Sequence, residues 1–339
     1  MKLTTPVEIP THDITICPTS KLTFIGSCFA QNIGLRASHA GIDTHVNPFG
    51  VLYNPLSIAV AIDAMLKQHP LQENIFLLSD GIWHCYLFDS TFSADTLDAC
   101  RHDITQTLER EARYIPFSDY LFLTFGTNRY YVLKETRRPV GNCHKQPAAL
   151  FEEKQLSIDE TVETLKSTLQ SLWTINAKLK VVCTISPYRY AKYGFHQSQI
   201  GKAVLLMAVE QLCCAYPNRC FYFPAYEILL DELRDYRFYA PDMLHPSETA
   251  VDYIWQLFAD NCFSQETKHL AAQWNEIERA ANHHPLHPQS KAQQTFLNLT
   301  TNKLRLLIKQ YPHLASTSAY KQLQAKLSLK TQPNAHPKQ

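Results

Sequence analysis

Short apolar runs alternate with amphipathic stretches along most of the chain. Five runs have the length and composition of strands, at residues 22–25, 44–46, 120–125, 180–185 and 220–223. The stretches between them place apolar residues at helical spacing. This alternation predicts an α/β protein with a three-layer, doubly wound fold, in which helices cover both faces of a parallel five-stranded sheet.

Local signals predict further elements between these strands. An Asp-Gly pair at residues 80–81 separates two β-prone runs, residues 75–78 and 82–88, and is a strong hairpin signal. A second hairpin is expected over residues 130–140. Ser157 and the glutamate three residues later have the spacing of a capping box, which predicts the start of a helix.

The pattern changes near the end of the chain. Residues 265–330 hold only helical patterns, and residues 331–339 are polar and contain proline. We therefore expect a core domain over residues 1–264, a helical C-terminal extension packed on it, and a disordered tail from residue 331.

Composition narrows the range of functions. Charge is balanced, with 32 Lys and Arg against 31 Asp and Glu, so no nucleic-acid or membrane partner is expected. The chain has neither a transmembrane run nor the pattern of a signal peptide at Met1, which predicts a cytoplasmic protein. The ten cysteines include no Cys-x-x-Cys pair and are expected to be reduced thiols.

No cofactor or metal is expected. The histidines at positions 283, 284 and 287 have a spacing that suits a metal, but Pro285 prevents them from sharing one helical face. A solvated loop is the simpler interpretation. The sequence leaves the oligomeric state open.

Side chains suited to acyl transfer follow the predicted strands. Ser27 ends the first strand, and Asp242 precedes His245 by three residues in a late loop. A histidine base can activate a serine hydroxyl, and an aspartate can hold the histidine in the required tautomer. The order Ser, Asp, His is that of α/β-hydrolases. We therefore expect Ser27, Asp242 and His245 to form a catalytic triad.

Three donors are expected to stabilise the oxyanion: the backbone N–H groups of Ser27 and Gly50, and the side-chain amide of Asn128. Glycine at position 50 would allow a close approach of the backbone. Each donor follows a predicted strand. Cys28 is a competing nucleophile, but as the first helical residue it is expected to point into the core.

Several blocks resemble the GSCFA family, whose name is spelled out at residues 26–30. Further blocks are NPFGVLYNP at 47–55, NCHK at 142–145, YE at 226–227, RDYRFY at 234–239 and HP at 245–246. That family is placed among the SGNH (GDSL-like) hydrolases, which implies a flavodoxin-like SGNH fold. The resemblance also implies that Ser27, Gly50, Asn128 and His245 are the four residues for which the SGNH group is named.

Two departures from the SGNH pattern stand out. The acidic residue expected before the serine is missing, because Gly26 stands there, and a Ser-Pro-Val-Arg-His block reads SPYRY at residues 186–190. Substrate-binding residues are expected in the loops around the cleft. The candidates are Asn142, His144, Lys145 and Arg189.

Together these features predict a serine-dependent esterase. Its expected substrate is a small-molecule or carbohydrate ester carrying a small acyl group such as acetyl, which rests on analogy with the superfamily. Two alternatives stay open: an acyltransferase that uses the same triad, and a ligand-binding module without turnover.

Overall fold

The computed structural model describes residues 4–10, 14–69, 71–283, 285–286 and 290–331. The chain divides into two compact units. The first comprises Met1–Asp13, Leu22–Gly34 and His45–Phe258, and the second comprises Ile14–Lys21, Leu35–Thr44 and Ala259–Gln339. The last segment of the second unit begins at Ala259, and the predicted domain boundary after residue 264 stays a prediction. The two short segments of the second unit were not expected, because they are far from its helices in sequence.

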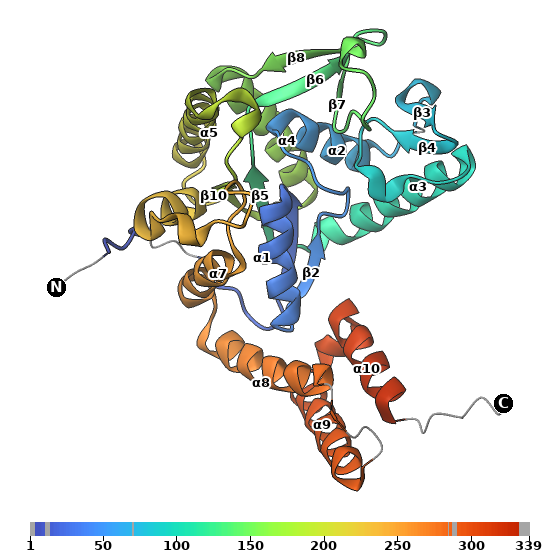
Figure 1. Cartoon of the computed structure of the whole chain (residues 1–339), viewed down its shortest axis with the longest axis vertical. Helices are drawn as coiled ribbons and strands as arrows, with labels where there is room; N and C mark the ends of the chain where they lie inside the picture. The colour runs from blue at the N-terminus through green and yellow to red at the C-terminus, as the bar shows by residue number, and fades with distance from the viewer. Residues whose placement is uncertain (1–3, 11–13, 70, 284, 287–289, 332–339) are drawn as a thin grey trace. The chain divides into compact units, whose positions relative to one another are not determined.

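A five-stranded parallel sheet lies mainly in the first unit (Figure 1). Its order is β10-β9-β5-β1-β2. The strands are β1 (Lys21–Gly26), β2 (Asp43–Val46), β5 (Tyr120–Phe125), β9 (Lys180–Ile185) and β10 (Cys220–Tyr222). Gly26 is in register with Thr124, and Thr124 with Thr184, so β1, β5 and β9 end at one edge of the sheet. The predicted sheet is confirmed.

Helices follow the strands, as the apolar spacing predicts. They are α1 (Cys28–His39), α2 (Pro55–Lys67), α3 (Leu97–Tyr114), α4 (Ile158–Ile175), α5 (Phe195–Ala215), α6 (Ala225–Glu227) and α7 (Glu248–Cys262). A π-helical segment, Ile228–Leu233, continues α6. The capping box at the start of α4 forms as expected: the Ser157 hydroxyl accepts from the Glu160 N–H, and the Glu160 carboxylate accepts from the Ser157 N–H.

Both faces of the sheet are covered. Leu121 and Leu123 belong to a buried cluster with side chains from α2, α3, α4 and α5. Phe122, which points to the opposite face, stacks on Phe24 with ring centroids 4.4 Å apart and meets Phe258 of α7 edge-on. This alternation is the one required of a strand between two helical layers.

Two antiparallel additions flank the sheet. The Asp-Gly turn joins β3 (Phe76–Ser79) to β4 (Ile82–Cys85), which confirms the first predicted hairpin. The second hairpin, β6 (Arg129–Leu133) with β7 (Arg138–Val140), gains a third strand, β8 (Phe151–Gln155), on the other side of β6. Strand β8 was not predicted because its sequence, FEEKQ, is mostly charged and has no continuous apolar run.

The second unit contains the predicted C-terminal helices. They are α8 (Gln265–Asn282), α9 (Lys291–Gln310) and α10 (Ser318–Thr331). Trp274 of α8 is buried and contacts Gly41, whose positive φ of 81° suits glycine. The predicted tail lies outside the described residues from position 332 onward. No helix in the described part of the chain is long and apolar enough to cross a membrane.

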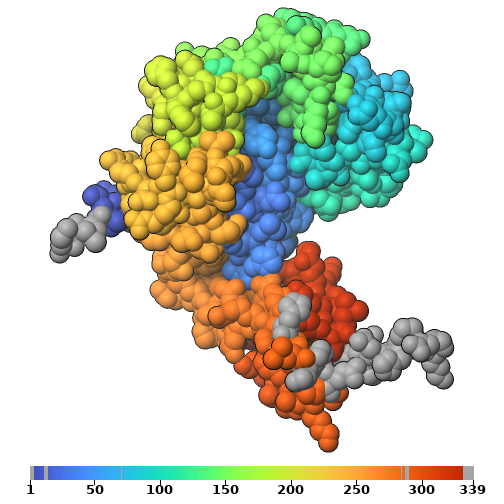
Figure 2. Space-filling view, viewed as in Figure 1, coloured from blue at the N-terminus to red at the C-terminus, as the bar shows by residue number. Residues whose placement is uncertain are grey.

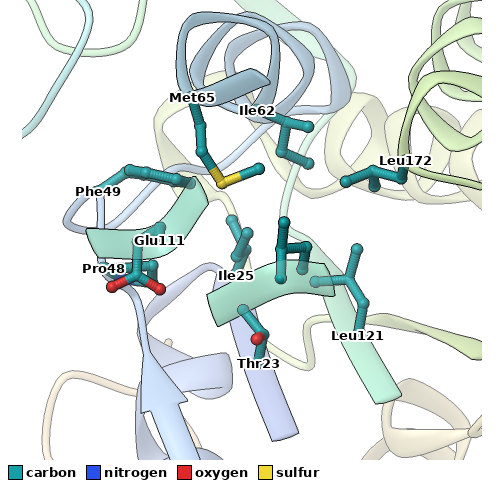
Figure 3. Close-up of a pocket in the computed structure, with 10 residues that line it drawn as sticks. Thr23, Ile25, Pro48, Phe49, Ile62, Met65, Glu111, Leu121 and Leu172 are labelled. Carbon is teal, nitrogen blue, oxygen red and sulfur yellow. The ribbon is translucent and has the colours of Figure 1, made fainter. Parts of the chain in front are cut away.

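A small cavity lies in the core of the first unit (Figure 3). Its volume is about 10 Å³, and mostly apolar side chains such as Ile25, Ile62 and Leu172 line it. The buried Glu111 carboxylate at its edge is held by His45 Nδ1 at 2.6 Å and by the Arg110 Nε at 2.7 Å. A space of this size holds no more than one water molecule, so it is too small for a substrate.

Candidate active site

Asp242 and His245 form a local pair. The Nδ1 atom of His245 lies 2.5 Å from Oδ2 of Asp242, while Oδ1 of Asp242 accepts from the backbone N–H groups of Leu244 and His245. The His245 contact and these two N–H groups lower the pKa of Asp242 to about 2. The side chains are 47% and 43% exposed, so the histidine is accessible to a bound molecule.

Backbone and side-chain contacts hold the loop of this pair. The Ala240 N–H donates to the His245 carbonyl at 2.8 Å, and the Arg189 N–H donates to the Leu244 carbonyl at 3.1 Å. The Arg189 guanidinium also donates to the Met243 carbonyl. The Tyr188 ring packs on the His245 ring with centroids 4.4 Å apart. With Nδ1 directed at Asp242, Nε2 is the ring atom that remains for chemistry.

A sharp turn joins β1 to α1. Gly26 has φ of 148°, and a Cβ at this position would lie 2.2 Å from the Thr124 carbonyl oxygen, so no other residue fits without a shift of the backbone. The Asn47 side chain braces the turn, because its Oδ1 accepts from the Gly26 N–H at 2.9 Å and its Nδ2 donates to the Ser27 carbonyl at 3.4 Å.

Ser27 is buried in this turn. Its side chain is 1% exposed, and its hydroxyl accepts from the Phe29 N–H at 3.3 Å. Its backbone N–H donates to the Thr124 carbonyl, and its own carbonyl accepts from Gln31. Ser27 therefore serves as the N-terminal cap of α1. Its predicted role as the nucleophile stays a prediction.

Cys28 differs from expectation, because its side chain is partly exposed. Burial raises the pKa of its thiol, while the Phe29 and Cys28 backbone N–H groups and the charge of Lys202 act in the opposite direction. After burial, the charge of Cys28 is one of the causes that raise the pKa of Tyr53, Tyr188 and Tyr190. The start of α1 thus carries a partly exposed thiol.

The three expected oxyanion donors are engaged within the protein. The N–H of Ser27 donates to Thr124, and the N–H of Gly50 donates to the Asn47 carbonyl at 2.8 Å. The Asn128 side chain is 2% exposed and donates to the Leu156 carbonyl at 2.8 Å. Ser27 directly follows β1, whereas Gly50 and Asn128 lie in the segments after β2 and β5, and the sequence does not reveal where their hydrogen bonds go. Their expected role as oxyanion donors stays a prediction.

The loop over residues 142–145 packs against the first hairpin. His144 is buried, its Nε2 lies 2.8 Å from the Cys85 carbonyl oxygen, and its ring stacks on His84. Asn142 accepts from the His144 N–H and forms a local turn, whereas Lys145 is exposed. These contacts give Asn142 and His144 structural partners, and their expected substrate-binding role stays untested.

Lys202 is a buried charge that the sequence analysis missed. Its ammonium donates to the carbonyls of Gly126 at 2.7 Å and Ser186 at 2.5 Å, which follow β5 and β9. Burial lowers its pKa to about 7. One signal for it was present: Lys202 occupies the same helical face as the buried Leu205 and Val209.

A pocket of about 220 Å³ adjoins the loop of residues 240–245, which carries Asp242 and His245 and is called the histidine loop below. In Figure 2 its two contributing segments, yellow and gold, lie side by side. Tyr188 and Arg189 belong both to this pocket and to the contacts that hold the histidine loop. The Arg189 guanidinium stacks on Phe195 at 4.1 Å and on Tyr239 at 5.2 Å. The walls are therefore aromatic and carry a positive charge.

No group of three or more metal-binding side chains gathers in the described ranges. Of the histidines considered as metal ligands, those at 284 and 287 lie outside the described residues.

The comparisons with known proteins agree with the residue blocks. The model of the GSCFA family matches residues 21–258, well over half of the chain. The model of the GSCFA domain protein C-terminal domain matches residues 274–329, which lie in the second unit. No curated protein matches the chain significantly. The chain therefore belongs to the GSCFA family.

Proposed function

We propose that this chain is an SGNH-type hydrolase that cleaves small acyl esters by nucleophilic catalysis. Asp242 and His245 supply the base, and the β1–α1 turn supplies the nucleophile. The observation that carries the proposal is the Asp242–His245 contact of 2.5 Å, made in a loop that Arg189 and Tyr188 hold in place. An imidazole oriented in this way is the usual partner of a hydroxyl or thiol nucleophile.

The reaction proceeds in two halves. His245 Nε2 takes the proton of the nucleophile as the latter attacks the ester carbonyl, and returns it to the departing alkoxide. Water then attacks the acyl-enzyme, with His245 again as base, and releases the acid. Two consecutive residues offer a candidate nucleophile, Ser27 with Oγ and Cys28 with Sγ, and the sequence of steps is the same for either.

The neighbouring pocket supports a polar leaving group. Aromatic side chains such as Tyr239 and Phe195 offer flat faces for a sugar ring or another planar group, and Arg189 offers a positive charge for an anionic substituent. This fits a carbohydrate or metabolite ester as substrate. The ten free thiols fit a reducing, cytoplasmic location, which is part of the same proposal.

The test is hydrolysis of p-nitrophenyl esters of increasing acyl length and of acetylated sugars by the purified chain. We expect turnover of the shortest acyl groups, and a loss of at least about 100-fold in kcat in His245→Ala. His102→Ala, which removes an exposed histidine of α3, is the matched control and should be unaffected. Equal activity of wild type and His245→Ala would contradict the proposal. Added acceptor alcohols reveal transfer if an acylated alcohol forms.

A further inference from the structure

We propose that the nucleophile is the thiol of Cys28 rather than the hydroxyl of Ser27, and that the Tyr190 hydroxyl donates to the oxyanion. This assignment rests on the proposed acyl-transfer function and specifies its reacting atoms. It reverses the order expected from the sequence, in which Cys28 points into the core.

The environment of Ser27 opposes a role in attack. A nucleophile needs access to a carbonyl carbon, but this side chain is 1% exposed. Its hydroxyl already caps α1 through the Phe29 N–H, and the backbone N–H of Ser27 is held by Thr124. Attack by Ser27 would break the cap and leave a helix N–H without its partner, at a cost of about 1 kcal/mol.

The Cys28 side chain is accessible to a bound molecule, and its surroundings suit a nucleophile. It is partly exposed and is the first residue of α1, where the positive end of the helix dipole favours a negative charge. Tyr188 lies near both groups: its ring packs on His245, and the charges of Asp242 and Cys28 add to the effect of burial in raising the pKa of its hydroxyl. The thiol and the Asp242–His245 pair therefore share one side chain as a common neighbour.

Tyr190 provides an independent indication that a ligand binds here. Its hydroxyl oxygen is buried and has no hydrogen-bond partner among the described residues. A buried donor without a partner costs about 1–3 kcal/mol, so a bound molecule that supplies an acceptor would be stabilised here. This hydroxyl lies beside Gly126, which follows β5: a Cβ added there would be 2.3 Å from it. Burial raises the pKa of Tyr190 well above the ordinary range, and the charge of Cys28 acts in the same direction, so the hydroxyl stays protonated. A carbonyl oxygen bound beside the thiol would supply the missing acceptor.

The buried Lys202 helps to place these groups. Its ammonium lies over the Tyr190 ring, 5.3 Å from the centroid, and is fixed by the two carbonyls at the ends of β5 and β9. Because the net pKa shift of Cys28 is upward, the resting group is a thiol and not a thiolate. A thiol of this kind needs a base, which is the role of His245.

The proposed reaction needs no reactant other than the ester and water, because each bond that forms is matched by one that breaks. Cys28 Sγ forms a bond to the acyl carbon while His245 takes the S–H proton, and the C–O bond to the leaving group breaks as His245 returns that proton to it. The intermediate is a thioester on Cys28. Water attacks this thioester, gives a proton to His245 and releases the carboxylic acid, and Cys28 recovers its proton from His245.

The direct test locates the acyl group. The full chain is incubated with p-nitrophenyl acetate, quenched in acid and mapped by peptide mass spectrometry, with and without neutral hydroxylamine, which cleaves thioesters rapidly and oxygen esters slowly. We expect one acetyl group on Cys28 that hydroxylamine removes, and loss of hydrolysis in Cys28→Ala. A hydroxylamine-resistant acetyl group on Ser27 would overturn the assignment.

A second measurement does not depend on turnover. Iodoacetamide alkylates accessible thiols, and the rate at each cysteine is followed by mapping in wild type and His245→Ala. At neutral pH we expect Cys28 to react at least tenfold faster in wild type, while the partly exposed Cys143 reacts equally in both. Equal rates at Cys28 would overturn the thiol assignment. If Cys28 responds to His245 but no ester is cleaved, the hydrolase proposal fails and the activated thiol stands.

Tyr190 is tested by Tyr190→Phe, which keeps the ring and removes the hydroxyl. Loss of one oxyanion donor should lower kcat about 100-fold and leave the Cys28 alkylation rate unchanged. An unchanged kcat would exclude Tyr190 as the donor.

Discussion

Arg189 donates from its guanidinium to the backbone carbonyl of Met243 at 2.9 Å, in the middle of the loop that carries Asp242 and His245. Its backbone N–H donates to Leu244 next to it. Met243 has a positive φ of 59°, a conformation that a residue other than glycine adopts only when its surroundings impose it. Arg189 thus stabilises an otherwise unfavourable loop.

Replacing Arg189 by alanine should therefore reduce catalysis more than binding. A small displacement of the imidazole lowers kcat by about 10- to 100-fold. Arg234→Ala is the matched control: Arg234 lines the same pocket, but its guanidinium pairs with Asp231 and not with the loop. Equal kcat losses in the two variants would show that pocket charge, not loop support, explains the effect. Ester hydrolysis at saturating substrate is the measurement.

Asp242→Asn should lower kcat/KM by about 10³- to 10⁴-fold, because the amide holds the wrong tautomer of His245. The pH profile gives a second check. The pKa of Asp242 is lowered to about 2, so its carboxylate is ionised throughout the range above pH 4. A fall in wild-type kcat/KM between pH 8 and pH 5 then reflects protonation elsewhere than on Asp242. If Asp242→Asn retains the wild-type kcat/KM, Asp242 has no role in the mechanism.

Lys202→Met should change how stability depends on pH. Burial lowers the pKa of Lys202 from 10.5 to about 7, so between these values the unfolded chain binds the proton and the folded chain does not. Raising the pH through this window therefore stabilises wild type relative to the variant, by up to about 1.4 kcal/mol per pH unit. Urea unfolding of both proteins at pH 7 to 10 measures the difference, and a constant difference contradicts the prediction.

Gly26→Ala should destabilise the fold by about 3 kcal/mol or more, because the new Cβ meets the Thr124 carbonyl and the backbone has a positive φ. Gly81→Ala separates the two causes. Gly81 also has a positive φ, but nothing lies within 4 Å of the added Cβ, so a cost of about 1 kcal/mol is expected. Similar urea midpoints for the two variants would show that the close approach to β5 contributes little.

The sequence was sufficient to predict the sheet, the first hairpin and the short-range Asp242–His245 contact, since these depend on periodicity and on neighbours along the chain. Strand β8 was not predicted because its charged residues show no apolar pattern: it pairs with β6 through backbone hydrogen bonds and through the Glu153 carboxylate, which contacts Arg129 and Tyr131. At the β1–α1 turn, Ser27 and Cys28 are adjacent. Successive side chains of a helix differ in direction by about 100° around its axis. No periodic pattern decides which of two such neighbours faces the cleft.

The pattern of hydrophobic and polar positions could not predict the hydrogen bond of Gly50 or the burial of Lys202 either. Gly50 donates to Asn47 because of the local course of the turn, and Lys202 finds two carbonyls contributed by strand ends far apart in sequence. Such contacts depend on distances between segments that periodicity does not encode.

The three-residue spacing of Asp242 and His245 has a consequence for folding. Closing so short a segment loses little chain entropy, so this contact can form early and re-form quickly after a fluctuation. The β1–α1 turn comes from the opposite end of the first unit's sequence. It follows β1, whereas Tyr188 follows β9, so the two segments come to the same edge of the sheet only when β1, β5 and β9 are assembled. Heating should therefore disconnect the reactive turn from its base when the sheet opens, while the base and its carboxylate stay together as a local unit.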